Sequence, residues 1–213
     1  MKRAIIFDMD GVLIDSEIVY QEWVFEFLEE NQFYYPLAKY QQKIGTTFSI
    51  FDDFEDYNKA VDIDSVRKNF QLFCRKKKLD YPAIFSKSIK NQLDWMSKNE
   101  FLLAIASSSP LYAIKEMVKS CGIEEYFSCM ISGRDLSESK PNPAIYLKAA
   151  KELRVSPAQC YVIEDSYNGI LAGKRAGMEV IAIEDQRFSH DLTMANCIIP
   201  TIDLLKETIE SKK

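Results

Sequence analysis

Short apolar segments recur along the chain, and most are followed by a segment that carries helix signals. Their apolar residues follow one another without alternation, which is typical of strands buried on both faces of a parallel sheet. Alternation of such strands with helices predicts a doubly wound α/β domain. The expected strands are Arg3–Phe7, Phe101–Ala106, Ser128–Ile131, Tyr161–Ile163 and Val180–Ile183, with Cys197–Ile199 as a further edge strand.

Proline, asparagine, serine and glycine mark the expected helix ends. Ser109 and Pro110 are predicted as the N-cap and first residue of a helix that runs to about residue 120. Asn142-Pro143 repeats this signal for a helix that extends to about residue 153. A third helix is expected after Asp165-Ser166 and ends near Gly177, because glycine suits the left-handed position that follows a helix.

Residues 16–90 break this alternation, because no strand is evident there and helices are expected around residues 38–42, 51–57 and 65–75. We interpret residues 16–90 as a helical unit inserted between residues 1–15 and 91–213, which form the α/β domain. The first helix of the insert carries an apolar and aromatic stripe that we interpret as the core of this unit. The stripe consists of Tyr20, Trp23, Val24, Phe27 and Leu28.

Polar side chains occur at four points just beyond the expected strands. In a doubly wound sheet the carboxyl ends of parallel strands share one edge, and ligands bind at that edge. We therefore expect these side chains to lie in one site. They are Asp8 with Asp10, Ser107 with Ser108, Lys140, and Glu164 with Asp165.

The pair Asp8 and Asp10 predicts a divalent cation. Two carboxylates about 4 Å apart repel each other by roughly 4 kcal/mol at an effective dielectric constant near 20. Mg²⁺ removes that cost, since it prefers oxygen ligands and commonly couples a few carboxylates to a substrate phosphate. Glu164 and Asp165 would complete the acidic group, although Asp165 could instead cap a helix. The pattern predicts Mg²⁺-dependent phosphoryl transfer with Asp8 as the nucleophile.

Lys140 and the serines supply the positive charge and hydrogen-bond donors that such a reaction needs. Attack of an aspartate on a phosphate brings two anions together, so it requires cations on the phosphoryl oxygens. Lys140 lies in a turn stiffened by the prolines that follow it. The hydroxyl of Ser107 and the backbone amide of Ser108 lie near an expected helix N-terminus, which favours anions.

Composition narrows the remaining classes of function. The single histidine, His190, excludes multi-histidine zinc sites, and we expect it in a solvated surface loop. Five scattered cysteines without a C-x-x-C pair predict reduced thiols in a cytoplasmic protein. The net charge of −5 argues against nucleic acid as a partner, and no apolar run is long enough to span a membrane. We expect a small phosphorylated metabolite as the partner; the oligomeric state is open, and a monomer is compatible.

The motifs also resemble those of a known family. Ser107 and Lys140 are similar to the second and third motifs of the haloacid dehalogenase superfamily, in its β-phosphoglucomutase-like branch. The segments that resemble the first motif, the fourth motif and its continuation are Phe7–Glu17, Glu164–Gly169 and Ala172–Met178.

This resemblance implies a Rossmann-like core with a helical cap and a phospho-aspartyl intermediate on Asp8. It also implies that Asp10 is the general acid and base. Mg²⁺ would be held by Asp8, the backbone carbonyl of Asp10 and Asp165, with Glu164 nearby or contributing.

Two departures from the family pattern bear on the substrate. The sugar-phosphate mutases of this branch carry an arginine in the cap shortly after a glycine, whereas residues 45–48 are Gly-Thr-Thr-Phe. They also carry a lysine after the second motif, where this chain has Pro110. We therefore expect a phosphatase that acts on a small phosphomonoester, a sugar phosphate in particular, with a β-phosphoglucomutase-type mutase as the alternative.

A phosphorylatable signalling receiver is a more distant alternative, because it also combines an aspartate pocket, Mg²⁺ and a lysine. A receiver has no helical insert after its first strand, and its phosphorylated aspartate lies on a middle strand. Here the third expected strand ends at Ile131, and Asp135 is displaced into the loop.

Overall fold

The computed structural model describes residues 2–44, 49–188 and 190–212 of the chain. These residues divide into two compact units. Residues 1–15 and 81–213 form one unit, which we call the core unit, and residues 16–80 form the other, which we call the helical unit. The helical unit therefore ends at Asp80, whereas the sequence pattern placed its end near residue 90.

The difference arises because residues 81–90 pack on the core unit. Ile14 forms a bridge with Phe85, and the amide of Asp15 donates a hydrogen bond of 2.9 Å to the carbonyl of Ile84. Ile89 is fully buried. Helix α4 (Tyr81–Ile84) has only four residues, so the sequence gives no sign that the chain has already returned to the core unit.

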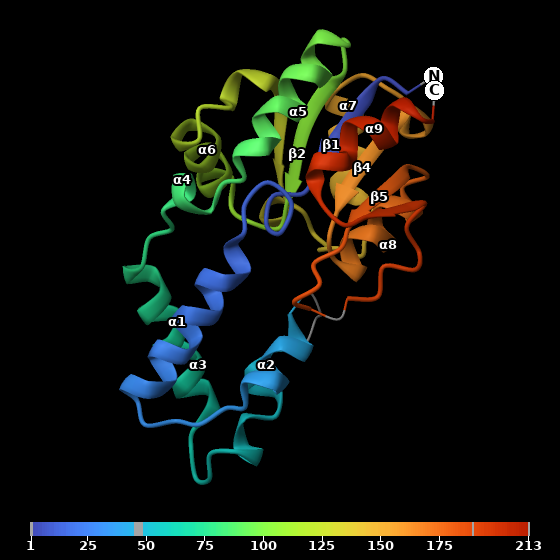
Figure 1. The fold of residues 1–213 in the computed structure, drawn as a ribbon. Coiled ribbons are helices and arrows are strands. Elements are labelled where there is room, and N and C mark those ends of the chain that lie inside the picture. The colour runs from blue at the N-terminus through green and yellow to red at the C-terminus, as the bar shows by residue number, and fades with distance from the viewer. Residues whose placement is uncertain (1, 45–48, 189, 213) are drawn as a thin grey trace. The chain divides into compact units, whose positions relative to one another are not determined.

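The core unit contains a sheet of six parallel strands in the order β3-β2-β1-β4-β5-β6 (Figure 1). Every strand expected from the sequence is present, and β6 lies at the edge as predicted. The reversal of strand order around β1 is that of a Rossmann-like, doubly wound sheet. The strands are β1 (Ala4–Phe7), β2 (Leu102–Ser107), β3 (Phe127–Ser132), β4 (Cys160–Glu164), β5 (Glu179–Ile183) and β6 (Cys197–Ile199).

Helices cover both faces of this sheet. Helices α7 (Ala144–Glu152) and α8 (Tyr167–Arg175) share one buried cluster with side chains of β1, β2, β4 and β5. Helices α5 (Lys87–Lys98) and α9 (Leu205–Glu210) contact each other and lie on the other face (Figure 1). Helix α6 (Leu111–Ser120) packs against β3. The expected α/β fold is therefore confirmed.

The strand register brings the ends of three strands together. Phe7, the last residue of β1, pairs with Ile105 of β2 on one side and with Ile163 of β4 on the other. Asp8 therefore emerges between the carboxyl ends of β2 and β4, at the point where ligands bind in sheets of this type.

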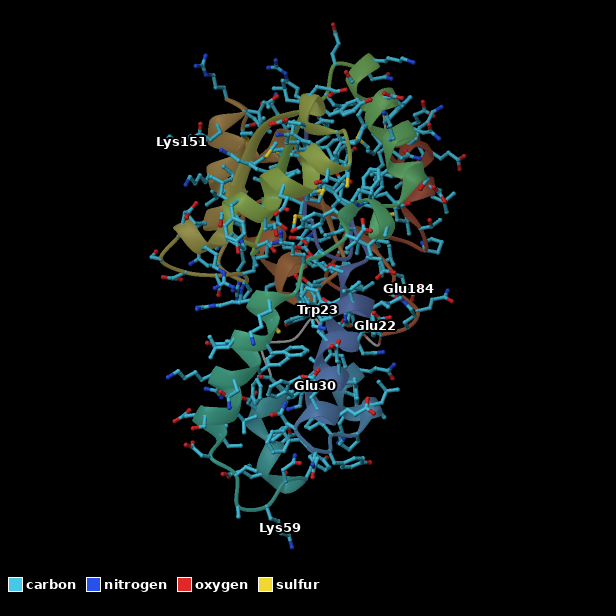
Figure 2. All side chains as sticks on the ribbon, turned by 90° about the vertical axis from the view of Figure 1, so that its left-hand side faces the viewer. Glu22, Trp23, Glu30, Lys59, Lys151 and Glu184 are labelled. Carbon is cyan, nitrogen blue, oxygen red and sulfur yellow. The ribbon has the colours of Figure 1, made fainter. Side chains whose placement is uncertain are left out.

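The helical unit contains α1 (Ser16–Glu30), α2 (Leu37–Lys43) and α3 (Ile63–Lys76). Phe27 of the predicted aromatic stripe lies 5.2 Å from Phe70 and 5.6 Å from Phe73, between ring centres, inside this unit. Val24, Phe27 and Leu28 are buried as predicted, whereas Tyr20 and Trp23 of the stripe are only half-buried. Charged side chains such as Glu30 and Lys59 point outward (Figure 2).

The stretch 51–57 was expected to form a helix, but it forms two short 3₁₀ turns, Ile50–Asp52 and Phe54–Asp56. Asp53 separates them with a backbone outside helical geometry (φ −135°, ψ 22°), and its carboxylate accepts hydrogen bonds from Lys43 and Tyr35.

Among the described residues, no helix has both the length and the apolar character that crossing a membrane requires.

Candidate active site

Asp8 lies at the centre of the candidate site. It follows β1, and its amide donates to the carbonyl of Ile163 at 2.9 Å, so the end of β4 fixes its backbone. The residue is 7% exposed. Burial raises the pKa of Asp8 to about 7, against the opposing effect of the Lys140 ammonium and with further increases from Glu164 and Asp10. The charge of this carboxylate therefore depends on the cations beside it.

Lys140 is the cation that contacts Asp8. Its Nζ donates to a carboxylate oxygen of Asp8, to Glu164 Oε1 at 2.7 Å and to the carbonyl of Ala106 at 3.2 Å. The ammonium also lies 5.1 Å from the ring centre of Tyr146, a cation–π contact. Burial alone would lower the pKa of Lys140, but Asp8 and Glu164 outweigh it and raise the pKa well above its ordinary value. Lys140 therefore remains charged.

Glu164 is fully buried, and both of its carboxylate oxygens accept hydrogen bonds. Oε1 accepts from Lys140 and from the hydroxyl of Tyr146 at 2.7 Å. Oε2 accepts from the amide of Asp165 at 3.0 Å and from the amide and hydroxyl of Ser166 at 3.1 and 3.0 Å. Burial raises the pKa of Glu164, but Lys140 and these donors outweigh it, so the net shift is downward. Glu164, expected near the metal, is thus surrounded by donors of the protein itself.

Asp10 accepts hydrogen bonds from two serines. Ser109 Oγ lies 2.9 Å from Asp10 Oδ2, and Ser107 Oγ makes a longer contact of 3.5 Å with the same oxygen. The amide of Ser109 also donates to Ser107 Oγ at 3.0 Å. Ser107 is fully buried, whereas Ser108 is exposed at the turn between β2 and α6.

The prediction that Ser109 caps α6 was wrong. The helix begins at Leu111, its N-cap is Pro110, and no side chain caps it. Pro110 has an extended backbone (ψ 148°), so Ser109 lies outside the helix and its hydroxyl is free to turn towards Asp10. Sequence reasoning therefore missed a residue that contacts a predicted catalytic carboxylate.

Asp165 is 8% exposed, and its carboxylate lies against the backbone of Gly11. A Cβ atom at Gly11 would stand 1.8 Å from Asp165 Oδ2, and Gly11 has a φ of +78°, which side chains rarely adopt. The glycine that follows Asp10 thus lets Asp165 approach the segment that carries Asp8 and Asp10.

His190 is not the solvated surface residue that the sequence suggested. It is half-buried, and its Nδ1 lies 2.9 Å from the backbone carbonyl of Asp165. Because a carbonyl only accepts, Nδ1 carries the proton. The ring stacks on Phe188, and Nε2 is buried without a hydrogen-bond partner among the described residues.

The oxygen donors at this edge suit Mg²⁺ better than a metal that needs four protein side chains as ligands. In the described part of the chain, no three or more His, Cys, Asp or Glu side chains are grouped as a metal site. Mg²⁺ keeps several waters and needs only one or two carboxylates beside the substrate phosphate. Asp8, Asp165 and the carbonyl of Asp10 are the candidate oxygen ligands for such an ion, whereas structural zinc requires four ligands.

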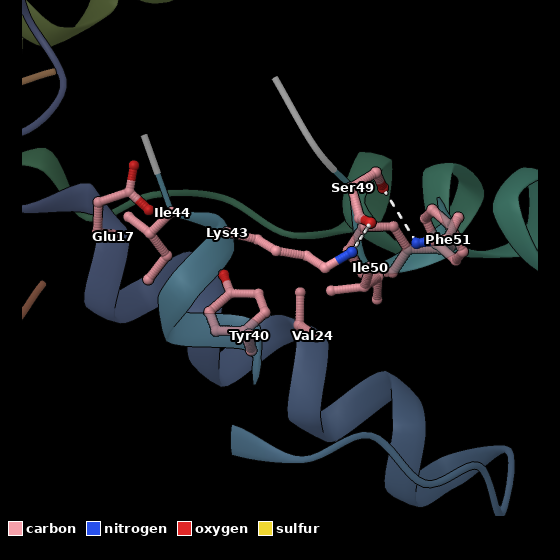
Figure 3. Close-up of a pocket in the computed structure, with 9 residues that line it drawn as sticks. Glu17, Val24, Tyr40, Lys43, Ile44, Ser49, Ile50 and Phe51 are labelled. Atoms are coloured by element: carbon pink, nitrogen blue, oxygen red, sulfur yellow. Dashed lines mark hydrogen bonds between the residues drawn. The ribbon is translucent and has the colours of Figure 1, made fainter. Parts of the chain in front are cut away.

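The helical unit contains a separate pocket of about 200 Å³, shown in Figure 3. The polar side chains of Glu17, Tyr40 and Lys43 line it together with apolar ones. The ammonium of Lys43 is held by the carbonyl of Ser49 at 2.8 Å and by Asp53 at 2.9 Å. Residues 45–48, where the sequence lacks the arginine of the mutases, lie outside the described residues.

Comparison with known proteins agrees with this fold and arrangement. The chain matches the haloacid dehalogenase-like hydrolase family over residues 5–183. It is 31% identical to YhcW of Bacillus subtilis, provisionally assigned as a phosphatase, over 87% of this chain and 85% of that protein. It is 30% identical to a phosphorylated carbohydrates phosphatase of Thermotoga maritima, over 84% and 83% of the two chains.

A solved structure from Agrobacterium tumefaciens, a haloacid dehalogenase-like protein of unknown function, superposes with a TM-score of 0.80. It is 26% identical and covers 100% of this chain and 99% of its own. The fold, the family match and the motifs around Asp8 and Lys140 lead to one assignment. The chain belongs to the haloacid dehalogenase-like hydrolases, an enzyme family.

Proposed function

We propose that this protein is a Mg²⁺-dependent phosphatase that hydrolyses a small phosphomonoester through a phospho-aspartyl intermediate on Asp8. The observation that carries the proposal is the ion pair between buried Asp8 and Lys140 at the end of β1, beside Asp10. A carboxylate held next to a fixed cation at a ligand-binding sheet edge is suited to attack an anionic phosphate.

The reaction has two steps. In the first, a carboxylate oxygen of Asp8 attacks phosphorus, the bond from phosphorus to the substrate oxygen breaks, and Asp10 protonates that oxygen. In the second, Asp10 removes a proton from water, whose oxygen attacks the phosphoryl group and releases phosphate and free Asp8. Lys140, Ser107 and the amide of Ser108 would hold the phosphoryl oxygens. Ser109 would orient Asp10 through the hydrogen bond of 2.9 Å.

We further propose that Asp8, Asp165 and the backbone carbonyl of Asp10 hold Mg²⁺, with Glu164 contributing through Lys140 rather than as a ligand. When bound, the ion supplies the positive charge that lets two anions approach. The hydrogen bonds that occupy both oxygens of Glu164 support this division of roles.

The substrate proposed is a sugar phosphate that carries one phosphate group. The relative from Thermotoga maritima is described as a phosphatase of phosphorylated carbohydrates. Pro110 stands where the mutases of the family carry a lysine that would help to hold a second phosphate. This difference favours a substrate with one phosphate group. The cytoplasmic location remains a prediction from composition.

The test is a panel assay of phosphate release with Mg²⁺ across sugar phosphates, nucleotides and phosphoglycolate. We expect release of inorganic phosphate from several sugar phosphates. Conversion of β-glucose 1-phosphate to glucose 6-phosphate with little free phosphate would instead establish the mutase alternative.

Mg²⁺ is expected to stabilise the protein through Asp165. A ligand present at 100 times its Kd raises the free energy of unfolding by about 2.7 kcal/mol. Thermal unfolding with and without Mg²⁺ should show this increase for the wild type and a much smaller one for Asp165→Asn. The exposed Asp135→Asn serves as the control and should respond like the wild type. An equal response of Asp165→Asn would remove Asp165 from the metal site.

A further inference from the structure

The buried carboxylate of Glu164 has no direct part in the two chemical steps, yet it contacts the lysine on which they depend. Its Oε1 accepts from both Lys140, at 2.7 Å, and the hydroxyl of Tyr146, also at 2.7 Å. Tyr146 is itself fully buried in α7, and its ring lies beside the same ammonium. Hydrogen bonds therefore link Tyr146 to Glu164, Glu164 to Lys140 and Lys140 to Asp8.

The backbone around Glu164 is shaped to hold its carboxylate in one position. A Cβ atom at Gly169 would stand 1.6 Å from Glu164 Oε1 and 1.9 Å from its carboxyl carbon, so the group rests directly on helix α8. The amides of Asp165 and Ser166 and the hydroxyl of Ser166 bind the other oxygen. Oε1, by contrast, accepts its hydrogen bonds from two side chains, those of Lys140 and Tyr146.

Because Oε1 of Glu164 accepts from both Lys140 and Tyr146, the Tyr146 hydroxyl affects the position of the Lys140 ammonium. A buried carboxylate needs hydrogen bonds and a counter-charge, because unpaired burial is strongly unfavourable. If the Tyr146 hydroxyl were absent, Lys140 would be the remaining side-chain donor to Oε1. The ammonium would then be drawn towards Glu164 and away from Asp8 and the phosphoryl oxygens.

We propose that Tyr146 is a positioning residue for phosphoryl transfer. Its hydroxyl fixes Glu164 Oε1, and Glu164 in turn holds the Lys140 ammonium against Asp8. This proposal rests on the proposed function, since it concerns the same reaction at Asp8.

The first test is Tyr146→Phe, which removes the hydroxyl and keeps the ring that packs in α7 and faces Lys140. We expect kcat for phosphate release to fall roughly three- to tenfold, the effect of one lost hydrogen bond, with KM within about twofold of the wild type. The matched control is Tyr161→Phe, a buried tyrosine on β4 that lies against Lys2, and it should keep the wild-type kcat. An unchanged kcat in Tyr146→Phe would overturn the proposal.

The second test is a double-mutant cycle with Glu164→Gln, which separates positioning from a general loss of structure. If Tyr146 acts through Glu164, Tyr146→Phe should lower kcat by less than about twofold in the Glu164→Gln background. Two effects that simply multiply would show that Tyr146 acts independently and would overturn the proposal. Failure of the proposed function is distinguished by Asp8→Asn, which would then retain turnover whatever the Tyr146 variants do.

Discussion

Replacement of Asp8 by asparagine is expected to lower kcat for phosphate release by roughly 10⁴-fold or more, because an amide cannot replace the carboxylate nucleophile. The substitution hardly changes the volume of this buried side chain. It also removes a charge whose burial raises the pKa of Asp8 to about 7, while Lys140 keeps its ion pair with Glu164. The free energy of unfolding measured without Mg²⁺ should therefore be close to that of the wild type.

Steady-state phosphate release and chemical denaturation of Asp8→Asn check both parts of this prediction. The matched control is Asp135→Asn, an exposed residue in the 3₁₀ turn after β3, which should retain full activity. Asp135 is the aspartate that follows the third strand, and it was considered above for the receiver alternative. Turnover that survives in Asp8→Asn and is lost in Asp135→Asn would contradict the assignment of Asp8.

Most of the fold that could be predicted followed from local sequence patterns, that is, from the properties of residues that are consecutive in the chain. The strands were identified because segments such as Val180–Ile183 are apolar without interruption and have turn or helix signals on both sides. The end of the helical unit was misplaced because residues 81–90 join the core unit through contacts with Ile14 and Asp15, which lie far away in the sequence. Helical periodicity contains no information about the unit against which a helix packs.

The residues of the candidate site also fall into two groups, those that local sequence patterns identify and those that only contacts between distant residues reveal. Asp8, Asp10, Ser107, Lys140 and Glu164 could be found because polar residues that follow buried strands converge at one sheet edge. Hydrogen bonds join Lys140 to Asp8 and Glu164, and a separate, longer one joins Ser107 to Asp10. The roles of three further residues depend on distant partners. They are Ser109, 99 residues from Asp10; Tyr146, 18 residues from Glu164; and His190, 25 residues from Asp165.

The second large effect is expected for Lys140→Met, which removes the cation between two buried carboxylates. We expect kcat to fall roughly 10²- to 10³-fold, the typical cost of losing one preorganised electrostatic group. Breaking a buried ion pair by removing one partner typically also costs about 3–5 kcal/mol of stability. The matched control is Lys151→Met on the exposed side of α7 (Figure 2), whose unfolding free energy should change by less than about 0.5 kcal/mol.

The stability of Lys140→Met should depend on Mg²⁺ more strongly than that of the wild type. Without Lys140, the buried carboxylates of Asp8 and Glu164 lose the cation that both contact, and Mg²⁺ at the proposed site would supply positive charge to Asp8 in its place. Denaturation with Mg²⁺ and with a chelator would measure this difference for the variant, the wild type and Lys151→Met. If Mg²⁺ stabilises all three equally, Lys140 and the metal do not share Asp8. The ion pair between Lys140 and Asp8 would then stabilise the fold independently of the metal.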